Sequence, residues 1–316
     1  MTAVLLLLSL AVWTNRQYIA DSIQYWRYEP TAAVQSIVDK VAFSDKGTFL
    51  FYASHPTLDG SQKFNESCSR KEQHTAILGC YANNRIYLYD ITDEQLKGIK
   101  EVTAAHEMLH AVYVRLSTTE RERIDGLLEK EYQKLAAQEG YEERMAFYAR
   151  TQPGERQNEL HSIIGTEVAE IGSELEAHYA RYFADRKNVI ALHDSYSAVF
   201  RQLEKDASVI RQQLEVIEEE RRIAIASYSQ ALDEIEAEID AFNARAQRGG
   251  FASPAVFNRE RSALVARTAE LESQRVRINQ MVIDYNELVI RYNNTVVRSQ
   301  DLYKSIDSSL APIPAI

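Results

Sequence analysis

The chain has 316 residues, 45% of them hydrophobic and 26% charged, so it is long enough for a sizeable core and too apolar for an intrinsically disordered protein. Lys and Arg number 36 against 46 for Asp and Glu. A net charge of −10 without a basic cluster excludes nucleic acid as an expected partner. Only 11 glycines and 6 prolines interrupt the sequence, which predicts long helices.

The N-terminal segment, residues 1–14, is strongly apolar. Residues 2–13 read TAVLLLLSLAVW, and the first charged side chain is Arg16. The run is shorter than the roughly 20 apolar residues of a membrane-spanning helix, and it lacks the basic start and cleavage site of a signal peptide. Three interpretations stay open: a membrane anchor whose beginning is absent from the chain, an uncleaved export segment, or a buried core helix. Four consecutive leucines favour the membrane anchor.

Cys68 and Cys80 are the only cysteines, which excludes a four-cysteine zinc site and an iron–sulfur cluster. They flank a short polar segment that a disulfide would close as a loop, and the alternative is two unpaired thiols. A disulfide indicates an oxidising compartment, whereas Arg16 and Arg27 after the apolar run favour a cytoplasmic location. Of these two locations, we predict the extracytoplasmic face of a membrane, in agreement with a disulfide.

The first half of the chain is expected to combine helices with a small sheet. Apolar spacing predicts a helix that ends at Glu29-Pro30 and a second helix over residues 31–41. Three β-type runs follow, at residues 48–53, 76–81 and 85–90. Asn83-Asn84 joins the last two as a hairpin, because Asn tolerates a positive φ. The expected later helices span residues 97–116, 118 onward after a cap at Ser117 or Thr118, 141–150, 158–164 and 173–185.

From about residue 200 the apolar residues follow a heptad-like pattern. The first arm advances by alternating steps of four and three: Leu203, Ala207, Ile210, Leu214, Ile217. A second arm runs from Leu264 to Val296, and residues 248–254 between the arms form a turn signal. The pattern predicts an antiparallel coiled-coil hairpin over residues 196–303, available to a protein partner or to self-association. Residues 304–316 are expected to be a flexible tail.

The strongest functional signal is His-Glu-x-x-His, from His106 through Glu107 to His110. On a helix, the two histidines lie one turn apart on the same face, so both imidazoles can bind one metal ion. Glu107 lies beside them and can accept a proton from water, whose pKa zinc lowers to about 7. The pattern therefore predicts a Zn²⁺ site with Glu107 as general base. The alternative is a pair of structural histidines in a buried helix.

This pattern resembles the zincin metallopeptidases, in which a β-sheet with an exposed edge strand precedes the His-Glu-x-x-His helix. The resemblance implies an α+β, mainly α, zincin-like domain over residues 15–195 that hydrolyses peptide bonds. It also implies that Arg85–Asp90 is the edge strand to which a peptide substrate adds. The whole arrangement is similar to that of uncharacterised membrane-anchored proteins of bacteria.

The third metal ligand decides the subfamily. The residues after His110 lack the Gly and His of a metzincin, whereas gluzincins take a Glu from a later helix. Glu159-Leu160-His161-Ser162 is similar to the ligand segment of some toxin-type gluzincins, which implies Glu159 as the third ligand. Glu167 is the alternative ligand or a partner of a ligand histidine, and His161 is a further candidate for either role.

Two functions follow from these features. The first is a membrane-anchored zinc metallopeptidase of gluzincin type. The second is a catalytically inactive coiled-coil scaffold of the cell envelope with a structural or vestigial metal site. Glu107 favours the enzyme, because a structural zinc site needs the histidines but no acid between them.

Overall fold

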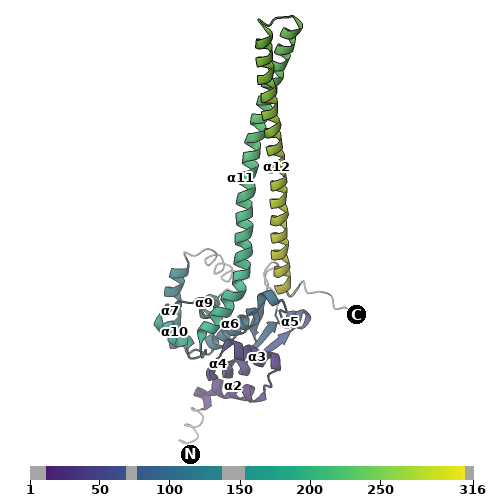
Figure 1. The fold of residues 1–316 in the computed structure, drawn as a ribbon. Helices are drawn as coiled ribbons and strands as arrows, with labels where there is room; N and C mark the ends of the chain where they lie inside the picture. Colours follow the sequence, from purple (N-terminus) through teal and green to yellow (C-terminus); the bar gives the residue numbers. More distant parts are fainter. Residues whose placement is uncertain (1–11, 69–76, 137–153, 310–316) are drawn as a thin grey trace, which may run out of the picture. The chain divides into compact units, whose positions relative to one another are not determined.

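A computed structural model describes residues 12–68, 77–136 and 154–309 (Figure 1). The fold is mainly α-helical with one small three-stranded sheet, as predicted. The chain divides into two compact units: Met1–Phe200 with Gln300–Ile316, and Arg201–Ser299. The second unit is shorter than the predicted 196–303 hairpin because both of its helices extend into the first unit.

The helices and strands of the first unit are, in order, α2 (Arg16–Arg27), α3 (Ala32–Val41), α4 (Asp45–Ala53), β1 (Thr57–Asp59), α5 (Ser61–Ser67), β2 (Gly79–Ala82), β3 (Arg85–Tyr89), the 3₁₀ helix η1 (Glu94–Leu96), α6 (Ile99–Val114), α7 (Thr118–Leu135), α9 (Arg156–Glu167) and α10 (Ser173–Tyr179). Two long helices follow, α11 (Arg186–Gln247) and α12 (Pro254–Ile306). The cap predicted at Ser117 or Thr118 is confirmed at Ser117, whose side chain accepts from the N–H of Glu120 in α7. At the start of α3, the Thr31 side chain accepts in the same way from the N–H of Val34.

The sheet has the strand order β1-β3-β2. The predicted hairpin of β2 and β3 is confirmed, with φ values of 51° at Asn83 and 60° at Asn84 in its turn. The prediction that Arg85–Asp90 forms the edge strand is wrong, because β1 pairs in parallel with its other side. The three-residue strand β1 is too short to give a sequence signal. Among the described residues, β2 pairs on one side only and is an edge strand.

The β-strand predicted at residues 48–53 is also wrong, because this segment lies in helix α4. Ser44 begins the helix by accepting a hydrogen bond from the Gly47 N–H at 3.1 Å. Phe51 is fully buried in the core, while Phe49 contacts the Tyr25 ring of α2 at a centroid distance of 5.2 Å. A short helix buried on two sides has the same continuous apolar run as a buried strand, so periodicity did not separate them.

The core of the first unit is built around α6, which packs against α3, α4, α9 and both strands of the hairpin. It packs tightly against α9 at Gly165. A Cβ there would lie 2.4 Å from Leu109 Cδ1 and 2.8 Å from Tyr179 Cε1. Helix α9 therefore continues through Gly165 to Glu167 rather than ending there as predicted, because this glycine permits close helix packing instead of stopping the helix.

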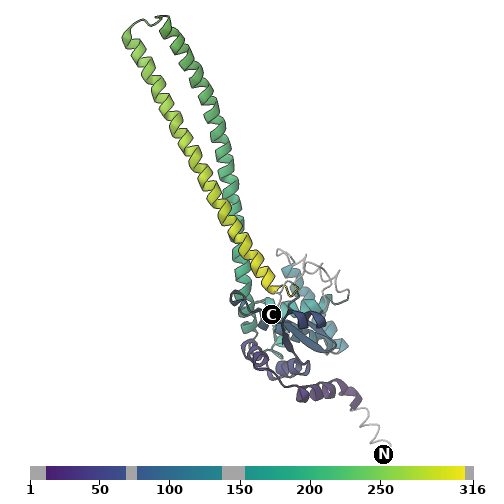
Figure 2. The same cartoon turned by 90° about the vertical axis from the view of Figure 1, so that its right-hand side faces the viewer.

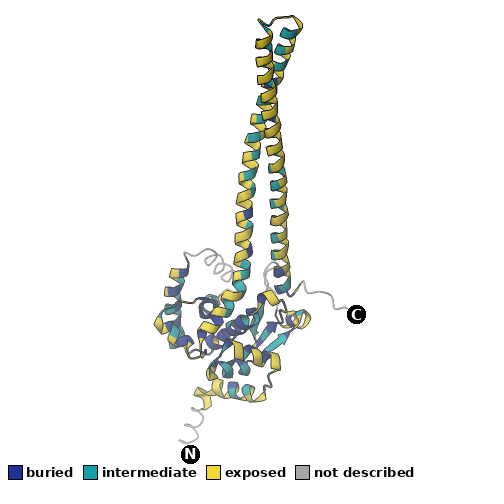
Figure 3. Cartoon of the chain, in the orientation of Figure 1, coloured by how far each residue is buried: buried dark blue, intermediate teal, exposed yellow. Residues whose placement is uncertain are grey.

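The second unit is the predicted antiparallel pair of long helices, seen along two directions in Figures 1 and 2. Its buried residues follow the heptad pattern, including Ile210, Ile235 and Leu271. The outward residues are largely exposed (Figure 3). One row of them is apolar. This row recurs at every seventh position of α12: Val276, Ile283, Ile290, Val297.

The structure describes only part of the predicted N-terminal anchor and of the predicted C-terminal tail. Residues 1–11 of the predicted anchor and the predicted helix at 141–150 lie outside the described residues. No helix in the described part of the chain is long and apolar enough to cross a membrane. The prediction of a flexible tail is wrong for residues 304–309, because α12 continues to Ile306 and the buried Ser308 exchanges two hydrogen bonds with Asn65, at 2.7 and 3.0 Å. Residues 310–316 lie outside the described residues.

Candidate metal centre

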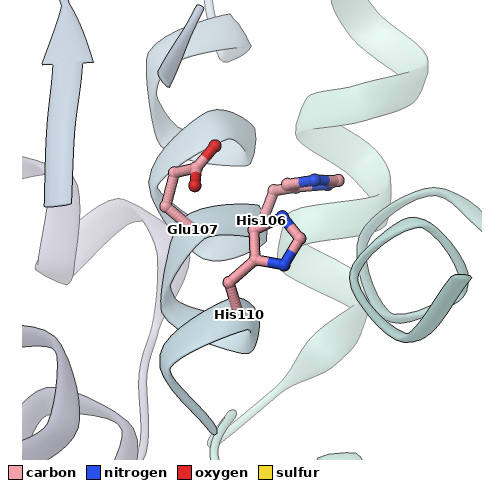
Figure 4. Close-up of side chains that lie close together, drawn as sticks. All are labelled: His106, Glu107 and His110. Atoms are coloured by element: carbon pink, nitrogen blue, oxygen red, sulfur yellow. The ribbon is translucent and has the colours of Figure 1, made fainter. Parts of the chain in front are cut away.

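Helix α6 places His106 and His110 on one side, as their spacing predicts. Their ring centroids lie 4.8 Å apart with planes at 78° (Figure 4). The Glu107 carboxylate projects from a different side of the helix, although ligand atoms of all three residues lie within 4.8 Å of one another. The small buried neighbours Ala104 and Ala105 let other elements pack closely around this turn.

Helix α9 brings Glu159 to the two imidazoles. Its Oε2 lies 3.4 Å from His106 Nε2 and its Oε1 lies 3.7 Å from His110 Nε2. The side chains of Glu159, His110 and His106 are 5%, 10% and 18% exposed, so the three groups meet at the margin of the core with access on the side of His106.

The spacing of these atoms fits a shared metal ion better than hydrogen bonds. An N–H···O bond has its optimum near 2.9 Å. Ligands at 2.0–2.1 Å from a tetrahedral zinc ion are about 3.3 Å from one another. Two imidazole nitrogens with one carboxylate also form the donor set of catalytic zinc sites. The residues present therefore fit Zn²⁺, with one Glu159 oxygen within 3.4 Å of His106 Nε2 and the other within 3.7 Å of His110 Nε2.

Asn158 determines which nitrogen of His110 faces Glu159. Its amide NH₂ donates to the Glu155 carboxylate at 2.9 Å, which directs its Oδ1 to His110 Nδ1, also at 2.9 Å. Because Oδ1 can only accept, Nδ1 carries the proton and Nε2 keeps its lone pair. An outer hydrogen bond of this kind orients a metal-ligating histidine. This role of Asn158 was not predicted from the sequence, where adjacency to Glu159 is the only signal for it.

Glu107 lies between α6 and the edge strand β2. The backbone N–H of Tyr81 donates to its carboxylate, and a Cβ at Gly79 would lie 3.0 Å from its Oε1. Its Oε2 is buried without a hydrogen-bond partner in the described structure. Burial, opposed by His110, raises the pKa of Glu107 to about 7. The carboxylate is thus held at one oxygen and suited to proton transfer near neutral pH.

The two alternative site residues have other neighbours. His161 Nε2 lies 2.9 Å from His178 Nε2, and burial lowers the pKa of His161 well below its usual value. Glu167 lies eight residues beyond Glu159, about 12 Å along α9, where its Oε2 is 3.7 Å from His193 Nε2. Neither is brought between His106 and His110.

Cys68 and Cys80 form a disulfide. It links the residue after α5 to the strand β2, one position before Tyr81. The bond therefore holds the strand that contacts Glu107.

Comparisons of the chain with family models, with curated proteins and with solved structures gave no match.

Proposed function

We propose that the chain is a zinc metallopeptidase of gluzincin type in which His106, His110 and Glu159 hold Zn²⁺. The convergence of Glu159 on both Nε2 atoms, at 3.4 and 3.7 Å, is the observation that carries the proposal. A bound zinc ion would supply Lewis acidity to the peptide carbonyl and a nucleophilic water at neutral pH.

Glu107 is the general base of this proposal. It accepts a proton from the attacking water and afterwards delivers it to the amine of the departing peptide. The hydrogen bond from Tyr81 keeps one carboxylate oxygen in place, and Oε2 is left for the proton. A pKa raised to about 7 allows Glu107 to accept and to release this proton at neutral pH.

The edge strand β2 is the proposed place for the substrate backbone. It takes the role assigned from the sequence to Arg85–Asp90, because β3 is paired on both sides. An extended peptide beside β2 would form main-chain hydrogen bonds next to Glu107. The substrate class is therefore a peptide or protein segment in extended conformation.

The proposed location is the extracytoplasmic face of a bacterial membrane, with attachment through the N-terminal segment. The Cys68–Cys80 disulfide supports an oxidising compartment. The apolar sequence of residues 2–13 supports attachment.

The second candidate function is a catalytically inactive envelope scaffold with a structural or vestigial metal site. The apolar row from Val276 to Val297 favours it, because each of its four side chains is more than half exposed and the seven-residue spacing suits a partner helix. In this alternative, the long helices bind a protein partner or a second copy.

The deciding experiment measures zinc content and peptide hydrolysis on the same full-length preparations. One zinc per chain is expected in the parent and in Glu167→Ala, the matched control, and its loss is expected in His110→Ala and Glu159→Ala. Glu107→Gln should keep zinc and lose 10²–10⁴-fold in hydrolysis of a peptide library. A folded parent without zinc affinity refutes the metal site. Zinc without any hydrolysis refutes the peptidase and leaves the scaffold.

A further inference from the structure

Helix α2 is fixed to the first unit by one of its faces. The buried Asp21 accepts two hydrogen bonds from the Arg115 guanidinium at the end of α6, at 2.7 and 2.9 Å. On the same side, the Tyr25 ring packs against Phe49 and Tyr52 of α4. These contacts determine which face of α2 points away from the protein.

The outward face of α2 is apolar and largely exposed in the described part of the chain. Ile19, Ile23 and Trp26 occupy positions i, i+4 and i+7, so they form one stripe. Their exposed fractions are 39%, 45% and 84%. An indole exposed to this extent is uncommon on a soluble surface, because Trp is highly buried on average. Trp13, just before the helix, is 63% exposed.

The charges of this face are positive, although the chain carries −10. Arg16 precedes Ile19 by three positions, Arg27 follows Ile23 by four, and both are exposed. The only acidic residue of α2, Asp21, is turned inward to Arg115. The Arg16 guanidinium also lies 5.2 Å from the Trp13 ring centroid. Aromatic and aliphatic side chains flanked by arginines are typical of helices that lie in a membrane interface.

We propose that the outward face of α2 lies on an anionic phospholipid surface, with Ile19, Ile23 and Trp26 at the boundary of headgroups and acyl chains. Residues 2–13, uncharged and leucine-rich, precede this face in the chain and supply the argument for a bilayer rather than a protein as the occupant. Arg16 and Arg27 then bind lipid phosphates. Because α2 is bound to α6, the surface also orients the unit that carries the candidate metal centre. This inference does not depend on catalysis.

The two tryptophans of the chain make the proposal directly measurable. In full-length Trp13→Phe protein, Trp26 is the sole tryptophan and reports only on α2. This variant is reconstituted by detergent removal into vesicles of phosphatidylcholine with phosphatidylglycerol. Trp26 emission should shift to shorter wavelength and be quenched more by lipids brominated near the headgroup than by lipids brominated near the chain end. The proposal would be overturned if the protein cosediments with the vesicles while Trp26 emits at the same wavelength as in detergent-free buffer without vesicles. That result would show that only the N-terminal run contacts lipid.

Two further variants test the face itself. Ile23→Glu, in the Trp13→Phe background, should abolish the quenching of Trp26 without changing the far-ultraviolet circular dichroism. Val209→Glu, at an apolar position of α11 that is 45% exposed like Ile23, is the matched control and should leave the quenching unchanged. Arg16→Ala and Arg27→Ala should each weaken Trp26 insertion about fivefold on anionic vesicles and have no effect on pure phosphatidylcholine. Full quenching in Ile23→Glu would overturn the proposal.

Discussion

Replacing Asn158 by Ala tests the geometry of the proposed metal centre without touching any ligand. Asn158 Oδ1 accepts from His110 Nδ1 at 2.9 Å, and both residues are 8% exposed. The substitution leaves a buried N–H without its acceptor, which costs about 1–3 kcal/mol. It also removes the group that selects the tautomer with a free Nε2. We expect zinc affinity to fall 10–100-fold, or about 1.4–2.7 kcal/mol.

The assay is competition for Zn²⁺ with a chromophoric chelator, on protein whose folding is verified by circular dichroism. Ser162→Ala is the matched control, because Ser162 Oγ lies 3.4 Å from the same Nδ1 and contributes a weaker contact. Its zinc affinity should change less than threefold. Asn158→Asp retains an acceptor and should recover most of the affinity. A folded Asn158→Ala protein with parental zinc affinity would refute the assigned tautomer and the role of His110 Nε2 as a ligand.

Three predictions concern the stability of the first unit. Gly165→Ala should destabilise it by about 1–3 kcal/mol, because the added Cβ overlaps Leu109 and Tyr179, whereas Gly126→Ala, in open space on α7, should stabilise it by about 0.5–1 kcal/mol. Urea denaturation measures both, and equal effects of the two substitutions would contradict the close packing of α6 and α9. Burial, with Arg181 and Arg123 nearby, lowers the pKa of His178 to about 4. The unfolded chain binds this proton near pH 6.5, so stability is complete above that pH and falls by about 3 kcal/mol as the pH decreases to 4. His178→Gln should flatten this part of the pH–stability curve, and a curve of unchanged slope would refute the assignment. Replacing Cys68 and Cys80 by Ser opens a loop with a sequence separation of 12 and should cost about 3 kcal/mol. Parental thermal stability of this variant would show that the disulfide does not constrain the unfolded chain.

Signals in the local sequence predicted the helices that begin at a capping side chain and the hairpin with asparagines in its turn. Thr31 and Ser117 accept the capping hydrogen bonds of their helices, and Asn83-Asn84 forms the positive-φ turn of the hairpin. The long heptad pattern likewise indicated the paired helices, because their cores repeat over many turns. The caps and the turn depend on residues a few positions apart, whereas the helix pair is indicated by the length of its repeat.

Tertiary packing decided the features that were missed. The segment at residues 48–53 is apolar on every side because α2 and the core cover it from two directions, and no periodicity reveals that. The three-residue strand β1 is formed by pairing with β3, which lies far from it in sequence. Because β1 occupies the second side of β3, the edge strand next to the hairpin turn is β2 and not β3. The pairing of His161 with His178 spans 17 positions and has no local signature.

The strand β2 shows why the proposed base could be predicted while its surroundings could not. Glu107 is recognisable because a motif requires an acid between two histidines. Gly79 acts by lacking a Cβ and Tyr81 through its backbone N–H, and neither role can be assigned before the packing of β2 against α6 is known. Alternation along the strand turns Cys80 to the opposite face, where its disulfide fixes β2 to the end of α5. The covalent tie and the contacts with Glu107 therefore act on the same strand from opposite faces. Loss of the disulfide should consequently affect the proposed base more than the three proposed ligands, which lie on helices α6 and α9.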